Sequence, residues 1–301
     1  MDSITHALLV ATLLTAVGSQ EFVLFGILGA VILDADILFT FISRNRPSLY
    51  LYIHGGAAHS ILGSTIMAVC AYIVFFLLSI IVTGTMHYPA IFTFGILALV
   101  CTVCGAWLHI ALDYLATPGI PLFWPLSEKK YTAGIFAGPS FFMIIVSWIF
   151  IVLLVAGIIP LTYLPVYGII FLVFLCIRSM IRIIAFVRVS GDTYPTFNPL
   201  RWMVIRKEGG SWSTGLFSLN GGTVGEVKYY PENTGITTDE LRKIETLPEV
   251  RRVRYHSYFT VAERNGDTVT IKDPSRENGT IRYPPYYKKV SIAADGRIIN
   301  D

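Results

Sequence analysis

Long apolar segments constrain the fold of this chain more than any other feature of its sequence. Five of them are each about as long as the ~20 residues that a helix needs to cross a bilayer, and they cover residues 22–42, 61–82, 90–115, 140–159 and 163–187. A shorter apolar helix over residues 3–18 lacks the pattern of a signal peptide and is expected to be retained. Only 14% of the residues are charged, against about 25% in soluble domains. The sequence therefore predicts a membrane protein with about six transmembrane helices.

The charged residues are unevenly distributed along the chain. Residues 1–192 hold only seven of the 23 Lys and Arg residues. Beyond them, short runs alternate apolar and polar residues as strands do, Asn220-Gly221 is a strong hairpin signal, and Thr237 with Glu240 matches a capping box. Strands are expected over 201–208, 211–219, 223–230, 258–264, 268–272 and 290–299, and a helix from Thr237 to about Thr246. We expect an all-α membrane domain over 1–190 and a small soluble α+β domain over 193–301.

Four short polar motifs interrupt the apolar segments. They are Thr5-His6, Asp34 with Asp36, His54 with His59, and His109 with Asp113. A charged residue at the bilayer centre costs roughly 2.5 to 3.5 kcal/mol, so three carboxylates would cost about 8 to 10 kcal/mol, as much as the whole stability of a typical domain. A metal cation bound by imidazoles and carboxylates would offset this cost directly.

The basic residues predict how the chain is oriented. The expected spans place five of them on one side of the membrane and none on the other; the five are Arg44, Arg46, Lys129, Lys130 and Arg188. Positive charge is enriched on the cytoplasmic side, so both termini are expected in the cytoplasm. The same topology brings all four polar motifs to the cytoplasmic ends of their helices. Their shared depth indicates one site.

Spacing within the motifs shows how they could meet. His109 and Asp113 lie four apart on a helix, with Cβ atoms about 5 to 6 Å apart, close enough to bind one ion. Asp34 and Asp36 point to different sides of an ideal helix, so both reach one site only if the helix ends or distorts there; otherwise one binds the metal and the other supports a ligand. Each pair also has a structural alternative, such as a His–Asp hydrogen bond at a helix end or separate interfacial histidines.

Together these residues predict a metal site with mixed nitrogen and oxygen ligands. The expected ligands are His6, Asp34, Asp36, His54, His59, His109 and Asp113. This set fits zinc, with enough ligands for one or two ions, and it leaves manganese or iron possible. In the C-terminal region His256 is expected to be structural, and Arg251, Arg252 and Arg254 are expected to form a solvated or headgroup-facing edge.

The order of these motifs resembles the YdjM-like family of inner-membrane metal-dependent hydrolases, also described as LexA-binding. The family pattern corresponds here to Thr5-His6, Asp34 with Asp36, the segment from His54 to Ser60, and His109 with Asp113 followed by Thr117 and Gly119. The resemblance covers roughly residues 1–190. Two departures are Gly55, where the family usually has Arg, and Ala58, where it has Thr; the first removes a cation that could hold a phosphate. More loosely, the order of ligands is similar to helical zinc-dependent phospholipase C.

These features predict a membrane-integral hydrolase that acts on a phosphoester. The metal would polarise a phosphoryl oxygen and activate water, and Asp34 or Asp36 would take the proton. The loop after the fourth span carries Phe123 and Trp124 beside Lys129 and Lys130, which suits the headgroup level of a bilayer. The expected substrate is therefore a lipid or polyprenyl phosphoester of the inner leaflet, and membrane lipids rather than nucleic acids are the expected partners.

Two other functions remain open from the sequence. Intramembrane His and Asp also mark ion pathways, so the chain could be a metal or proton transporter. Against this, an ion pathway needs polar residues in both halves of the membrane, and the non-cytoplasmic half of the expected membrane domain has only His87 and no buried charge. The third possibility is a non-enzymatic membrane protein whose tail binds a partner and whose metal site is structural.

Overall fold

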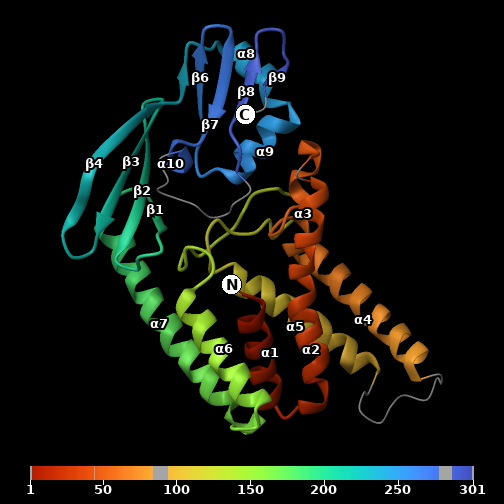
Figure 1. Cartoon of the computed structure of the whole chain (residues 1–301). Coiled ribbons are helices and arrows are strands. Elements are labelled where there is room, and N and C mark those ends of the chain that lie inside the picture. Colours follow the sequence, from red (N-terminus) through yellow and green to blue (C-terminus); the bar gives the residue numbers. More distant parts are fainter. Residues whose placement is uncertain (1, 44, 84–93, 278–286, 300–301) are drawn as a thin grey trace. The chain divides into compact units, whose positions relative to one another are not determined.

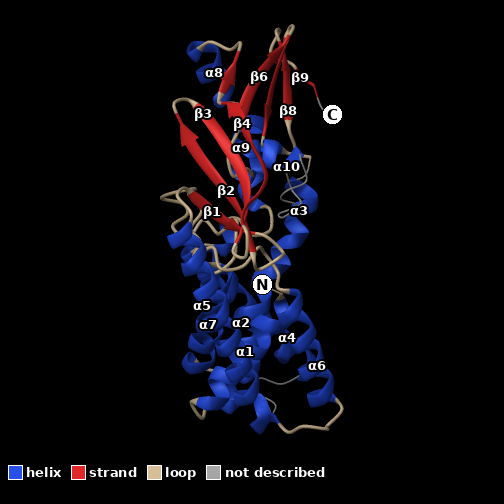
Figure 2. Ribbon diagram, turned by 90° about the vertical axis from the view of Figure 1, so that its left-hand side faces the viewer, coloured by secondary structure: helices blue, strands red, loops and turns tan. Residues whose placement is uncertain are grey.

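The structure is a computed structural model, and it describes residues 2–43, 45–83, 94–277 and 287–299. Its residues group into two compact units, which are Met1–Phe41 with Tyr52–Ser179, and Ile42–Leu51 with Met180–Asp301. The first unit is helical and the strands lie in the second (Figure 2). The expected domains, 1–190 and 193–301, remain a prediction, because this grouping does not test independent folding.

The N-terminal part of the chain is built of seven α-helices among the described residues (Figure 1). They are α1 Ser3–Ala16, α2 Val23–Ile32, α3 Ile37–Ser43, α4 Ile61–Thr83, α5 Ile96–Asp113, α6 Phe141–Val155 and α7 Leu164–Arg188. Short 3-10 turns lie between them: η1 Gln20–Phe22, η2 Leu33–Asp36, η3 Pro47–Tyr52, η4 Ala57–His59 and η5 Leu161–Tyr163.

Four helical segments are long and apolar enough to cross a membrane. They are Gln20–Ser43, Ile61–Val82, Ile96–Asp113 and Leu161–Arg188. The helices α1 and α6 are apolar but shorter, so six spans remain a prediction. The expected fourth span began at residue 90, whereas the helix begins at Ile96; residues 84–93 lie outside the described part of the chain.

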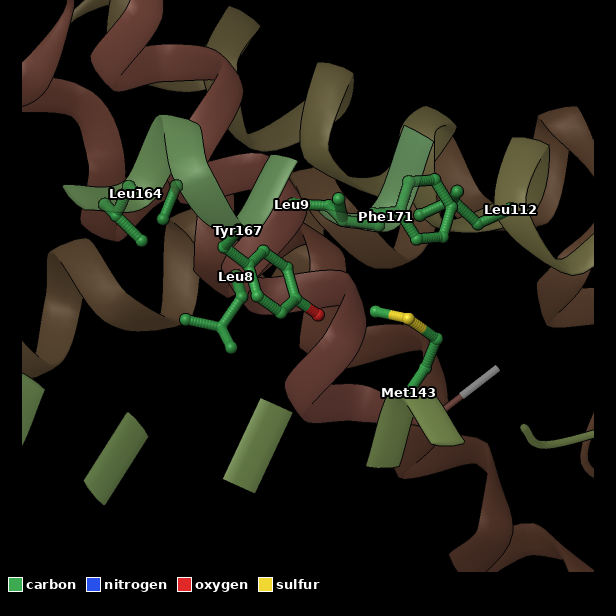
Figure 3. Close-up of a cluster of buried hydrophobic side chains, with 8 residues drawn as sticks. Leu8, Leu9, Leu112, Met143, Leu164, Tyr167 and Phe171 are labelled. Atoms are coloured by element: carbon green, nitrogen blue, oxygen red, sulfur yellow. The ribbon is translucent and has the colours of Figure 1, made fainter. Parts of the chain in front are cut away.

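Helix α1 packs inside the bundle rather than along its edge. The Asp2 side chain caps the helix by accepting from the Thr5 backbone nitrogen. Figure 3 shows the core in which the helix is buried, where side chains of α1, α5, α6 and α7 meet. The labelled residues are Leu8, Leu9, Leu112, Met143, Leu164, Tyr167 and Phe171. Burying α1 there brings its first turn, with His6, into the interior of the unit.

Glycines allow α2 and α5 to approach closely. A Cβ atom added to Gly29 would lie 1.8 Å from the carbonyl oxygen of Thr102, and one added to Gly105 would lie 2.1 Å from that of Gly26. Small residues allow such close approach between membrane helices. This contact places the end of α2 beside the last turns of α5, where His109 and Asp113 lie.

A folded loop over residues 114–140 follows α5. Two isolated bridges close it, between Ala116 and Phe136 and between Ile120 and Tyr131. The Ile61 backbone nitrogen donates to Leu122 O at 3.1 Å, which joins the loop to the start of α4 just beyond His59. Leu126 is 93% exposed. The loop therefore exposes an apolar side chain, and its expected position at the headgroup level stays a prediction.

The second unit contains two sheets. A four-stranded antiparallel sheet has the order β1-β2-β3-β4, and a five-stranded sheet has the order β5-β6-β7-β8-β9, in which only β5 and β6 are parallel. The strands are β1 Asp192–Pro195, β2 Arg201–Glu208, β3 Ser211–Ser218, β4 Gly222–Pro231, β5 Asn233–Thr234, β6 Val261–Asn265, β7 Thr268–Lys272, β8 Val290–Ala293 and β9 Ile298–Ile299. The helices are α8 Thr238–Glu245, α9 Pro248–His256 and α10 Pro274–Glu277.

Most elements of this unit follow the predicted pattern. Strands β2 and β7 have the expected limits, and the capping box of Thr237 and Glu240 starts α8 as expected. Helix α9 was not predicted, although Pro248 at its first turn is a common start signal. The expectation of a solvated arginine edge was wrong for Arg252, which is buried because this helix packs one side against the sheet core.

Candidate metal centre

All seven residues predicted as metal ligands lie in the first unit, and the structure brings them together. Helix α1 supplies His6, the turn η2 supplies Asp34 and Asp36, the segment ending in η4 supplies His54 and His59, and α5 supplies His109 and Asp113. The side chains of His6, His59 and His109 are fully buried, and Asp36 is 2% exposed. Three overlapping groups within this set could hold a metal ion; they are His6, His109 and Asp113, then Asp34, His59 and His109, and then Asp36, His54 and His59.

Four side chains converge most closely. The Nε2 atoms of His59 and His109 are 3.2 Å apart. Asp113 Oδ2 lies 3.5 Å from His59 Nε2 and 3.3 Å from His109 Nε2, and Asp34 Oδ1 lies 3.9 and 3.6 Å from the same two atoms. Ligands about 2.0 to 2.1 Å from a tetrahedral ion stand about 3.3 to 3.4 Å from one another. The distances from the two Nε2 atoms to each other and to the two carboxylate oxygens, 3.2 to 3.9 Å, are therefore close to that spacing.

The other edge of each imidazole is already engaged. His109 Nδ1 donates to the carbonyl oxygen of Ala30 at 2.6 Å. Asp36 contacts two rings at once, with Oδ1 2.6 Å from His54 Nδ1 and Oδ2 2.9 Å from His59 Nδ1. A partner at Nδ1 fixes the proton there and leaves Nε2 with its lone pair. Two such lone pairs facing each other at 3.2 Å repel, and a cation between them removes the repulsion.

A break in the second span lets both aspartates act on the same imidazoles. The α-helix stops at Ile32, a 3-10 turn covers Leu33–Asp36, and α3 continues from Ile37. Asp34 faces the Nε2 atoms while Asp36 holds Nδ1 atoms. This is the distortion that the two-residue spacing required.

The loop between the second and third spans shapes the other side of the centre. The Gly55 backbone nitrogen donates to Asp36 Oδ2 at 3.3 Å, and Gly55 has a φ of 76°, a conformation that glycine adopts without strain. Burial by itself lowers the pKa of His54, but its hydrogen bond with Asp36 and the charges of Asp36, Asp34 and Asp113 outweigh burial and raise that pKa above its usual value.

His6 stands at the edge of the cluster. Its ring stacks on that of His109 with centroids 3.8 Å apart, and its Nε2 lies 3.3 Å from Asp113 Oδ1. Neither ring nitrogen of His6 makes a hydrogen bond with the described residues. His6 is therefore placed, with His109 and Asp113, in a group that could hold a metal ion.

Sequence reasoning missed the residues that hold these ligands in place. The Ser3 hydroxyl donates to Asp34 Oδ2. Next to His6, Thr5 Oγ1 lies 2.8 Å from Ser147 Oγ, which lies 2.7 Å from the Tyr167 hydroxyl, and all three side chains are buried. A serine or threonine in an apolar helix was the available signal, but it does not reveal its partner. His256, expected to be structural, lies in the second unit, where its carbonyl accepts from Arg276.

A comparison with known proteins identifies one family. The sequence model of the YdjM inner membrane protein family matches residues 1–188. This range includes all seven residues of the cluster. Neither the curated proteins nor the solved structures that were compared with the chain gave a match.

Proposed function

The chain belongs to the YdjM inner membrane protein family, and on that premise we propose that it is a membrane-integral, metal-dependent hydrolase of phosphoesters. The observation that supports this most strongly is the buried convergence of His59 Nε2 and His109 Nε2 with Asp34 and Asp113 at the spacing of metal ligands. Membrane helices with a few unpaired polar residues would have no reason to gather both carboxylates and imidazoles at one point.

We assign the metal to these four residues, with His6 and His54 as the flanking ligands that a second ion would use. His54 Nε2 lies 4.0 Å from Asp34 Oδ1, and His6 Nε2 lies 3.3 Å from Asp113 Oδ1. The donor set suits zinc, with manganese or iron as alternatives. A divalent ion held there supplies Lewis acidity toward a phosphoryl oxygen and toward water.

Two further tasks, orienting the histidines and accepting a proton from the attacking water, divide between the two aspartates of η2. Asp36 has both oxygens on imidazole Nδ1 atoms and is almost fully buried, so we assign it the positioning of His54 and His59. Asp34 is 18% exposed and its Oδ2 accepts from Ser3. Asp34 is therefore the better placed of the two to take a proton from the attacking water, after which Ser3 can keep the carboxyl oriented.

The substrate we propose is a lipid or polyprenyl phosphoester presented from the cytoplasmic leaflet, with both termini in the cytoplasm. In support, the loop that follows Asp113 exposes Phe123 and Leu126, and Lys129 lies over the ring of Tyr131 at 5.6 Å. Apolar side chains next to a cation suit an interface with acyl chains on one side and phosphate on the other.

The test is turnover by the metal-loaded, detergent-purified protein. One series receives total membrane lipid extract and the other a panel of soluble phosphoesters, with Asp113→Ala as the blank. Phosphate or headgroup release from the lipid extract alone is the expected result. Release confined to the soluble panel would contradict the lipid assignment, and release from neither would contradict the hydrolase and favour a transporter.

A further inference from the structure

Arg178 is a buried cation of the first unit. It lies on α7, on the side that also carries the buried residues Leu164, Tyr167 and Phe171. Only 8% of its surface is exposed, whereas its neighbour Ile177 is 52% exposed on the outer side of the helix. Charged residues in membrane helices are costly and usually have a functional partner. The described contacts of Arg178 include a backbone carbonyl but no carboxylate.

The contacts of this guanidinium leave its charge without a counter-ion. Nη2 donates to the carbonyl oxygen of Ile135 at 3.1 Å, and the group lies 5.7 Å from the centroid of the Phe136 ring. Nε is buried and makes no hydrogen bond with the described residues. No carboxylate pairs with Arg178 within the described ranges, while Arg254 and Arg264 each pair with a glutamate. An uncompensated buried charge is expensive unless an anion joins it.

We propose that Arg178 is a phosphate-binding residue whose ligand is the phosphate of a membrane lipid. A guanidinium presents Nε–H and Nη–H as a planar fork that matches two phosphate oxygens. Ile177 and Met180 are exposed on the outer surface of α7 while Arg178 is turned inward, so a phosphate that comes from the lipid side has to pass between α7 and the segment of Ile135 and Phe136. Binding requires a small side-chain movement that uncovers Nε.

The surroundings of Arg178 connect this residue to the metal centre. Ile135, whose carbonyl Arg178 holds, donates its own nitrogen to Leu115 O at 2.8 Å, two residues beyond Asp113. We assign Arg178 a role in recognising the substrate of that centre. This role in substrate recognition rests on the proposed function, but binding of the phosphate does not, because it can be measured without turnover.

The experiment is native mass spectrometry of the full-length protein in detergent. Wild type, Arg178→Gln and the control Arg188→Gln are each titrated with short-chain phosphatidylglycerol, short-chain phosphatidylcholine and inorganic phosphate. Arg188 is a suitable control because it is an exposed arginine on the same helix that donates to a carbonyl. Wild type and Arg188→Gln are expected to bind phosphatidylglycerol equally, and Arg178→Gln about tenfold or more weakly, since charged hydrogen bonds are lost.

Each other outcome has a defined meaning. The proposal would be overturned if Arg178→Gln bound phosphatidylglycerol as tightly as wild type, or if both glutamine variants lost the same affinity. Arg178 would then only hold the Ile135 carbonyl in place. Arg178-dependent binding of inorganic phosphate without lipid binding would overturn the lipid source. If Arg178→Gln does not fold, Arg178→Lys keeps the charge but removes the fork, and wild-type affinity in that variant would contradict the proposal.

The same samples separate this proposal from the proposed function. Metal content is expected to be equal in all variants, because Arg178 contacts none of the seven cluster residues in the described structure. If lipid binding depends on Arg178 but the protein hydrolyses no phosphoester, the lipid site would be supported and the proposed hydrolase would be contradicted.

Discussion

Asp36 holds two histidines in place at once, so its side chain is the hardest one of the centre to replace. Its oxygens lie 2.6 and 2.9 Å from His54 Nδ1 and His59 Nδ1, and Gly55 donates to it as well. Partners of metal-bound histidines typically contribute 10- to 100-fold to metal affinity.

We therefore predict that Asp36→Asn weakens metal binding about tenfold or more without unfolding the protein, because the amide can accept from only one of the two rings. Competition with a metal-binding dye measures the dissociation constant. Asp239→Asn, an exposed aspartate on α8, is the control and should bind as wild type does. Unchanged affinity in Asp36→Asn would show that the rings need no such support.

Ser147 links the first helix to α7 through hydroxyl groups alone. The chain of contacts runs from Thr5 through Ser147 to Tyr167, and Thr5 is the neighbour of His6. We predict that Ser147→Ala lowers stability by about 1 to 3 kcal/mol, because two buried hydroxyls lose a partner. Thermal unfolding in detergent measures it, with Thr246→Ala as the control, since that exposed hydroxyl bonds the Lys243 carbonyl three residues before it. Equal unfolding temperatures would contradict the prediction.

At the scale of elements, the contact between α2 and α5 positions the centre. Gly29 lies where any Cβ would strike the Thr102 carbonyl, and one residue later Ala30 accepts from His109. Gly29→Ala is predicted to separate the helices, lower stability by about 1 to 3 kcal/mol as overpacking does, and weaken metal binding.

Unfolding temperature and metal affinity are measured on the same sample. Ala111→Val, which adds methyl groups to the exposed side of α5, should change neither quantity. If Gly29→Ala matches this control, the close approach of the helices is not required.

The sequence predicts elements better than it predicts their interruptions. Apolar length identified the four long spans, and turn and capping residues located β2, β7 and α8. The spacing of Asp34 and Asp36 showed that the helix must distort, but only the structure gives each carboxylate its own side of the rings. Ser3, Ser147 and Ala30 could not be predicted as partners, because their contacts join residues 31, 142 and 79 positions apart.

At the scale of the whole molecule, the C-terminal region carries its own cores. Buried residues of α9 and of strands β6 to β8 pack together, and a second cluster joins β2 with Phe259. We predict that residues 193–301 fold without the membrane helices. Hydrogen exchange of that segment expressed alone should show protected amides in β2, β3, β6 and β7. Complete exchange within the dead time would mean that the segment needs the rest of the chain.

The central claim is that the seven His and Asp residues form a metal centre, and metal analysis of the detergent-purified full-length protein tests it most directly. Wild type is predicted to carry at least one transition-metal ion per chain, with nitrogen and oxygen ligands at about 2.0 to 2.2 Å by X-ray absorption. His109→Ala and Asp113→Ala should lose that ion, and His256→Ala should keep it. Equal metal content in all four proteins, or a wild type that takes up neither zinc, manganese nor iron, would contradict the account.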